Sequence, residues 1–96
     1  MKRKIRVTSL EAFNEIVPTL GERQLFVLKG LRKLNRPVSN LMLSRYLHIP
    51  INQCVPRIYE LRKMGIVVMA KKDIDPITGK RVIYWQIKKW IQEIMN

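Results

Sequence analysis

The sequence predicts an α+β fold that is mostly helical, with one two-stranded β-hairpin near its C-terminal end. Two observations lead to this prediction. Apolar residues recur at helical spacing from residue 10 to residue 64, and residues 66–87 hold two runs of β-branched and aromatic residues around a turn-rich loop. The chain has 96 residues, 47% of them hydrophobic, which is enough for one packed core. We therefore expect a single domain over residues 1–96.

The first expected elements are a basic arm and a short helix. Residues 1–7 form the arm, which carries four Lys or Arg side chains. Residues 8–11, Thr-Ser-Leu-Glu, fit a capping box, in which the Thr and Glu side chains satisfy the first helical amides. The apolar face that follows is made by Leu10, Phe13, Ile16 and Val17. Pro18 ends this helix, because proline cannot donate the next backbone hydrogen bond.

Two further helices are expected between residues 19 and 47. Residues 19–22, Thr-Leu-Gly-Glu, fit a second capping box, and the helix that they begin runs to about Leu34. Ser39 or Asn40 can cap the next helix, because both side chains accept hydrogen bonds from exposed helical amides. This helix ends near Leu47, before a tight His-Ile-Pro connection.

The fourth helix completes a helix-turn-helix over residues 39–64. One inward stripe repeats at i, i+4 and i+7: Cys54, Ile58 and Leu61. At about 100° per residue, the outward positions are Asn52, Pro56, Tyr59, Glu60 and Lys63, and the flanks hold Gln53, Val55, Arg57 and Arg62. If Asn52 or Gln53 caps the helix, Pro56 falls in or just beyond the first turn, where a missing N–H has little effect.

A hairpin over residues 66–87 and a last helix over 88–95 complete the chain. The predicted strands are residues 66–71 and 82–87, with Pro76 and Gly79 in the loop between them. The last helix has an apolar face made by Ile87, Trp90, Ile91 and Ile94. It either packs on the first helices or meets a second copy, and we expect self-packing with weak homodimerisation. A helix pair followed by strand–loop–strand is the order of a winged helix-turn-helix.

The stretch NQCVPRIYELRKMGIV, followed by PITGKRVIYW, resembles the short winged-helix proteins carried by bacteriophages and prophages. The resemblance to MarR-type transcription regulators is looser. The matching residues are Asn52, Pro56, Arg57, Glu60, Leu61, Gly65, Thr78, Gly79, Lys80 and Trp85. The resemblance covers residues 20–87, and it implies a DNA-binding regulator of transcription or replication from a phage or mobile element.

The charge balance favours a polyanionic partner. The chain has 19 Lys and Arg against 7 Asp and Glu, a net charge of +12. Nucleic acid is the first candidate and an anionic membrane surface the second. No apolar run approaches the roughly 18 residues that span a bilayer. The basic N-terminus also leads into polar residues, so we expect a cytoplasmic protein, associated with the nucleoid or in a phage-infected host, and no membrane partner.

The winged-helix arrangement assigns two sets of candidate contacts with double-stranded DNA. The candidate base-reading residues are Asn52, Gln53, Val55, Pro56, Arg57 and Tyr59. Asn and Gln pair with adenine, Arg pairs with guanine, and an apolar edge such as Pro56 can touch a thymine methyl. The candidate phosphate contacts are Ser39, Asn40, Lys63, Lys71, Lys72, Lys80 and Arg81. Arg57 has an alternative role as an ion-pair partner of Glu60.

Other site chemistries lack the residues that they need. One Cys and one His exclude an intramolecular disulfide and a Cys/His zinc site within the chain, and Cys54 is expected in the core. The loop DIDPITG lacks the bidentate Glu of a calcium loop. We therefore expect no enzyme activity, cofactor, metal or small-molecule ligand. Two rival functions remain: a protein–protein adaptor that uses the apolar residues around Trp85 and Trp90, and an RNA-binding protein.

Overall fold

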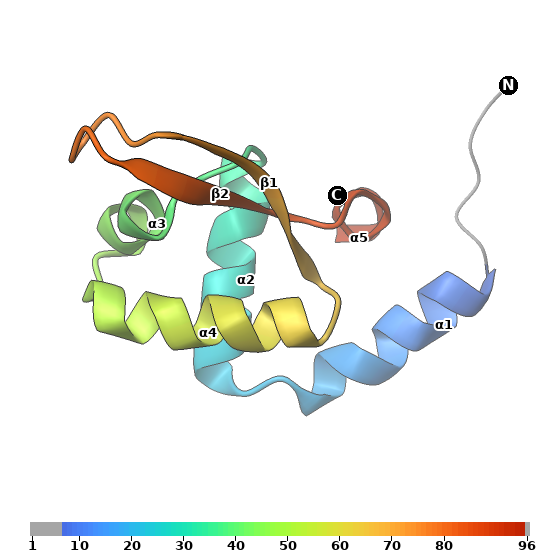
Figure 1. Ribbon diagram of the computed structural model, residues 1–96. Helices are drawn as coiled ribbons and strands as arrows, with labels where there is room; N and C mark the ends of the chain where they lie inside the picture. The colour runs from blue at the N-terminus through green and yellow to red at the C-terminus, as the bar shows by residue number, and fades with distance from the viewer. Residues whose placement is uncertain (1–6, 96) are drawn as a thin grey trace, which may run out of the picture.

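The computed structural model describes residues 7–95. In chain order its elements are α1 (Val7–Ile16), a 3-10 turn η1 (Val17–Thr19), α2 (Glu22–Leu34), α3 (Asn40–Leu47), α4 (Ile51–Lys63), β1 (Val67–Ile74), β2 (Arg81–Ile87) and α5 (Lys89–Met95). Figure 1 shows the hairpin lying along one side of the helices, with its tip over α3 and its base toward α5. The predicted α+β class, with its hairpin after the fourth helix, is confirmed. The predicted arm lies outside the described residues, except for Val7, which begins α1.

Two predicted helix starts are wrong. α1 begins before Thr8, so this residue is inside the helix and does not cap it. The Thr19 hydroxyl donates to the last carbonyl of α1, with 2.6 Å between the two oxygens, and does not cap α2. The N-cap of α2 is Gly21, whose N–H donates to Gln24 Oε1 at 3.0 Å. The reason is Pro18, whose fixed φ and missing N–H favour one more tight turn, and that turn uses the Thr19 hydroxyl.

The hydrophobic core lies where α2, α3 and α4 meet the base of the hairpin. Its most completely buried aliphatic side chains include Leu28, Leu31, Leu43, Leu61 and Ile66. Gly30 brings α2 close to α3, because a Cβ at this position would lie 2.7 Å from Leu47 Cδ2. Cys54 is fully buried in the same core, as expected, and burial raises the pKa of its thiol. The core therefore fixes the position of α4 relative to the rest of the chain.

The hairpin is antiparallel and longer than the sequence predicts. Its register runs from Val67 opposite Ile87 to Ile74 opposite Arg81, with an irregularity between Met69 and Lys71. Beside it, Val38 and Trp85 form an isolated bridge, in which each N–H donates to the other residue's carbonyl, at 2.9 and 2.7 Å. This bridge ties the base of the hairpin to the segment just before α3.

Helix α5 packs on its own chain. Ile91 is 2% exposed, and Trp90 meets Phe13 of α1 edge to face, with 6.4 Å between the ring centroids. The Arg32 guanidinium of α2 donates to the Met95 carbonyl at 3.1 Å, which satisfies one of the last carbonyls of α5. These contacts confirm the self-packing alternative for the last helix.

Candidate nucleic-acid interface

Helices α3 and α4 form a tightly connected pair. The Ser39 hydroxyl accepts a hydrogen bond from the Met42 N–H at 3.1 Å, so Ser39, one of the two predicted candidates, is the cap of α3. His48 ends α3 in the left-handed conformation, with φ of 57°. Pro50 then has an extended backbone and is the N-cap of α4. The chain therefore turns sharply within three residues, which places the start of α4 beside α3 (Figure 1).

Helix α4 has the two faces that the sequence predicts. Cys54, Ile58 and Leu61 are each at most 2% exposed, and they seat the helix on the core. Asn52, Gln53, Val55, Tyr59 and Lys63 are exposed on other faces, whereas Pro56 and Arg57 are half-buried.

The predicted cap at Asn52 or Gln53 is wrong. The helix begins at Ile51, so Pro56 is its sixth residue and lies beyond the first turn. Pro50 takes the capping position because its φ of −60° and ψ of 147° suit it, and its carbonyl accepts from the Gln53 N–H at 2.9 Å. Pro56 therefore removes the N–H that would have bonded to the Asn52 carbonyl, and the helix continues through this defect.

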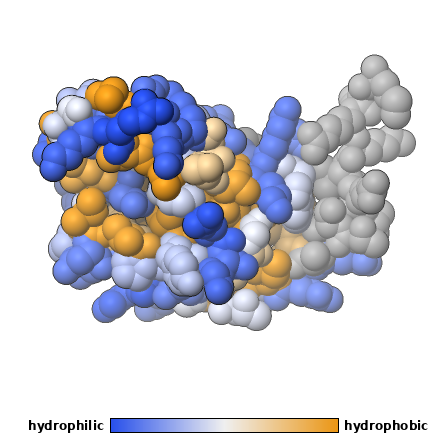
Figure 2. Space-filling view, in the orientation of Figure 1, coloured by the Kyte–Doolittle hydropathy of each residue, from blue (hydrophilic) through white to orange (hydrophobic). Residues whose placement is uncertain are grey.

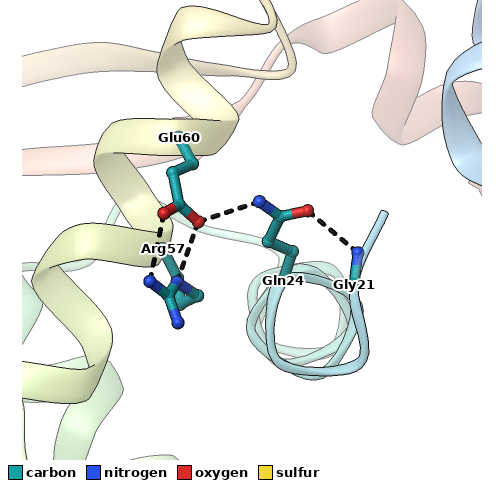
Figure 3. A network of polar contacts seen from close by, with 4 residues as sticks. All are labelled: Gly21, Gln24, Arg57 and Glu60. Carbon is teal, nitrogen blue, oxygen red and sulfur yellow. Dashed lines mark hydrogen bonds and ion pairs between the residues drawn. The ribbon is translucent and has the colours of Figure 1, made fainter. Parts of the chain in front are cut away.

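Arg57 is held by a polar network that joins α4 to α2 (Figure 3). Its Nε lies 2.8 Å from one Glu60 oxygen, and its Nη2 donates to the other at 3.0 Å. Gln24 of α2 donates to the same carboxylate at 2.8 Å, and its own oxygen accepts from the Gly21 N–H. The hydrogen bond from Gln24, and next the contact with Arg57, lower the pKa of Glu60. The structure therefore contains the Arg57–Glu60 pair, which the sequence left as an alternative.

The tip of the hairpin displays cations on a well-defined turn. Lys71, Lys72, Lys80 and Arg81 are all exposed, and Lys71 pairs with Asp73 at 3.3 Å. Figure 2 shows this tip as a strongly hydrophilic projection. The hydrogen bond from the Ile74 N–H, and next that from Lys71, lower the pKa of Asp73.

The turn itself is organised by a buried carboxylate. Asp75 is 1% exposed, and its Oδ1 accepts from the Ile77 N–H at 3.0 Å. Gly79 has a φ of 73°, which is a conformation that favours glycine. Asp75 therefore shapes the loop, as the sequence predicts, and its side chain points away from the surface.

A groove separates the hairpin tip from the starts of α3 and α4. It has a volume of about 410 Å³, and its lining includes Asn40, Ile51, Thr78, Lys80 and Trp85. Figure 2 shows hydrophobic residues in the hollow between the hydrophilic tip and α4. Trp85 is 8% exposed and belongs to the core, as expected, with the Arg62 guanidinium 5.4 Å from its ring centroid. Within residues 7–95, neither Trp85 Nε1 nor Asn40 Oδ1 has a hydrogen-bond partner.

The structure brings together some of the predicted contact residues and separates others. Ser39, Asn40 and Lys80 line the same groove. Ser39 is only 2% exposed, so its hydroxyl is used inside the protein. Arg57 faces α2, away from this groove. Sequence reasoning missed Ile51, which is 43% exposed beside the groove, although an apolar residue one turn before Val55 is a visible signal.

Metal binding and membrane crossing are two further possibilities for the described residues. No cluster of His, Cys, Asp and Glu side chains in residues 7–95 is suited to hold a metal ion. In the same range, no helix has both the length and the apolar character that crossing a membrane requires.

Comparisons with known proteins identify the fold. The chain matches no family model and no curated protein. It is similar to the solved structure of a possible transcriptional regulator from Methanosarcina mazei Go1, with a TM-score of 0.61 and 21% sequence identity. The alignment covers 91% of this chain and 73% of that one. The chain has a winged helix-turn-helix fold. In this fold, α4 occupies the position of the second helix of the helix-turn-helix, and the β1–β2 hairpin occupies that of the wing.

Proposed function

We propose that the protein is a regulator that binds double-stranded DNA, with α4 in the major groove and the wing on the sugar–phosphate backbone. The observation that carries the proposal is the pairing of two surfaces around one groove. The recognition helix begins on one side of it, and the cationic wing tip lies on the other. The net charge of +12 and the fold shared with a possible transcriptional regulator support the same function.

The resemblance over residues 20–87 supports a finer proposal. The regulator would come from a phage or mobile element and act in transcription or replication. Within the cell it would work where DNA is, in the cytoplasm.

The candidate phosphate contacts differ in exposure and in whether another side chain already pairs with them. Lys63, Lys72, Lys80 and Arg81 are exposed side chains that can reach a phosphate. Asn40 adds a polar side chain at the start of α3. Lys71 is partly neutralised by Asp73, and Ser39 is buried, so we expect both to contribute less. Four cations that each neutralise one phosphate predict a log–log salt slope of about −3.6.

The test is a salt titration of the protein with a random-sequence duplex. The Lys80→Ala variant should weaken binding to every sequence and reduce the slope by about one unit. Lys29→Ala is the matched control, because Lys29 is exposed on α2 in a hollow beside Phe13 and Met95, away from α4 and the wing. A slope near zero for the parent protein, or equal losses for Lys80→Ala and Lys29→Ala, would refute the proposal.

A duplex RNA of the same sequence separates the RNA-binding rival. The deep, narrow major groove of A-form RNA excludes a recognition helix, so we expect weaker binding to RNA than to DNA. Equal affinity for the two duplexes would favour the rival.

The structure gives less support to a protein–protein adaptor that uses the apolar residues around Trp85 and Trp90. Tyr84, Trp85, Ile87 and Ile91 are all less than 9% exposed, so half of the apolar residues assigned to an adaptor are inside the protein, and the others are half-buried.

A further inference from the structure

The recognition helix has an unusual outer surface for a protein with this much positive charge. Residues 51–58 contain one basic residue, Arg57, and it is turned toward α2. The side chains that α4 exposes over the same stretch are two amides, Asn52 and Gln53, and the aliphatic Ile51 and Val55. The part of α4 nearest the groove is therefore polar and apolar, without a free cation.

Arg57 is not available in this arrangement for the base contact that arginine usually makes. A guanidinium that reads guanine places two N–H groups on O6 and N7. Both Nε and Nη2 of Arg57 instead lie against Glu60, and only 22% of the Arg57 side chain is exposed. Gln24 holds the carboxylate from a second helix, so Glu60 cannot follow Arg57 outward without losing that bond.

Two exposed aliphatic residues and an exposed tyrosine form a ridge, defined here as Ile51, Val55 and Tyr59. They are spaced four residues apart, so they lie one above the other along the helix. They are 43%, 43% and 56% exposed, which is a substantial apolar area to leave in water. In the major groove the one apolar group on a base edge is the thymine methyl.

We propose that α4 selects A·T base pairs, with the Asn52 and Gln53 amides on adenine and the ridge on thymine methyl groups. This inference rests on the proposed function. It adds which base pairs the same surface of α4 selects. Duplex DNA is the occupant that the surroundings favour, because the Lys63 ammonium lies 5.6 Å from the centroid of the Tyr59 ring and Lys80 lines the groove. Asn and Gln match the paired acceptor and donor of adenine, so the amides and the ridge select the same base pair.

Four DNA duplexes of equal length test the inference. They are alternating A-T, alternating A with deoxyuridine (A-U), alternating G-C, and alternating G with 5-methylcytosine. The A-U duplex lacks only the thymine methyl groups, and the 5-methylcytosine duplex adds methyl groups to G·C pairs. We expect the A-T duplex to bind about tenfold more tightly than the G-C duplex, and the A-U duplex to lose several-fold of that advantage.

A substitution in the ridge supplies the internal control. Val55→Ala should reduce affinity for the A-T duplex to near that for the A-U duplex, and should reduce A-U binding by a clearly smaller factor. Val55 is half exposed, so the variant should keep the parent's unfolding temperature. Ile77→Ala removes an exposed aliphatic group from the wing tip, and it should preserve the difference between A-T and A-U.

The outcomes separate this inference from the function on which it rests. Equal affinities for all four duplexes with a steep salt dependence would overturn A·T selection and leave DNA binding in place. Equal affinities for A-T and A-U in the parent protein would overturn the role of the ridge. Failure to bind any duplex would refute the proposed function itself.

Discussion

Replacing Gly30 by Ala tests how closely α2 packs on the helix-turn-helix. The added Cβ would lie 2.7 Å from Leu47 Cδ2, and 3.2 Å from both Cδ1 and Cγ of the same side chain. Carbon atoms in ordinary contact are about 3.5–4.0 Å apart. The branched end of Leu47 must therefore move by roughly 1 Å, or α3 must move away from α2.

Two opposing effects set the magnitude of this change. Overpacking a tight contact costs about 1–3 kcal/mol of unfolding free energy. Replacing a glycine inside a helix by alanine stabilises the protein by about 1 kcal/mol, because alanine loses less backbone conformational entropy on folding. The cost of overpacking is the larger of the two effects, so the free energy of unfolding should fall by about 1 kcal/mol. For a domain of this size, that is a fall of about 4–8 °C in the unfolding temperature.

The assay is urea unfolding of four proteins: the parent, Gly30→Ala, Leu47→Ala and the double variant. Truncating Leu47 makes room for the new methyl group. The double variant should therefore be less destabilised than the sum of the single variants, by at least about 0.5 kcal/mol. A Gly30→Ala protein more stable than the parent, together with additive effects in the double variant, would refute this account of the helix contact.

Three further predictions concern stability. The pKa of Glu60 is lowered on folding, so its contribution is present above the unfolded value of about 4.3 and is lost as the pH falls through the lower folded value. Glu60→Gln should accordingly destabilise the protein at pH 7 and have little effect near pH 3 in urea titrations at both pH values; an equal effect at both would contradict this. Trp90→Asp should lower the free energy of unfolding by about 2–3 kcal/mol, because the ring packs against Phe13. Sedimentation of the same variant tests the weak dimer, and unchanged mass with unchanged stability would show that α5 is neither a clamp nor an interface. Gly79→Ala should cost about 1 kcal/mol from backbone strain alone, because nothing lies within 4 Å of the new Cβ, and an unchanged urea midpoint would disprove it.

The sequence predicted the parts of the molecule that depend on local periodicity. The buried stripe of Cys54, Ile58 and Leu61, the cap at Ser39 and the position of the hairpin follow from spacing and from residue type. These features need no knowledge of distant residues, since a helical face or a turn is encoded within a few positions.

Features that depend on contacts between distant segments could not be predicted in the same way. Gln24 lies 36 positions before Glu60, so the sequence offered the Arg57–Glu60 pair only as one of two alternatives. The capping error at Thr19 has a similar origin, because its hydroxyl is used by the preceding helix. The candidate DNA contacts remain predictions, since periodicity indicates which side chains face outward and not what they touch.

The bridge between Val38 and Trp85 affects how the hairpin is attached to the helices. Two short backbone hydrogen bonds pin the base of the wing to the segment that leads into α3. The base of the wing is therefore held to the segment before α3 by these hydrogen bonds, in addition to the covalent connection from α4 to β1. Changes in the tip beyond Ile74 would leave this attachment intact, because Val38 and Trp85 lie toward the opposite end of the hairpin.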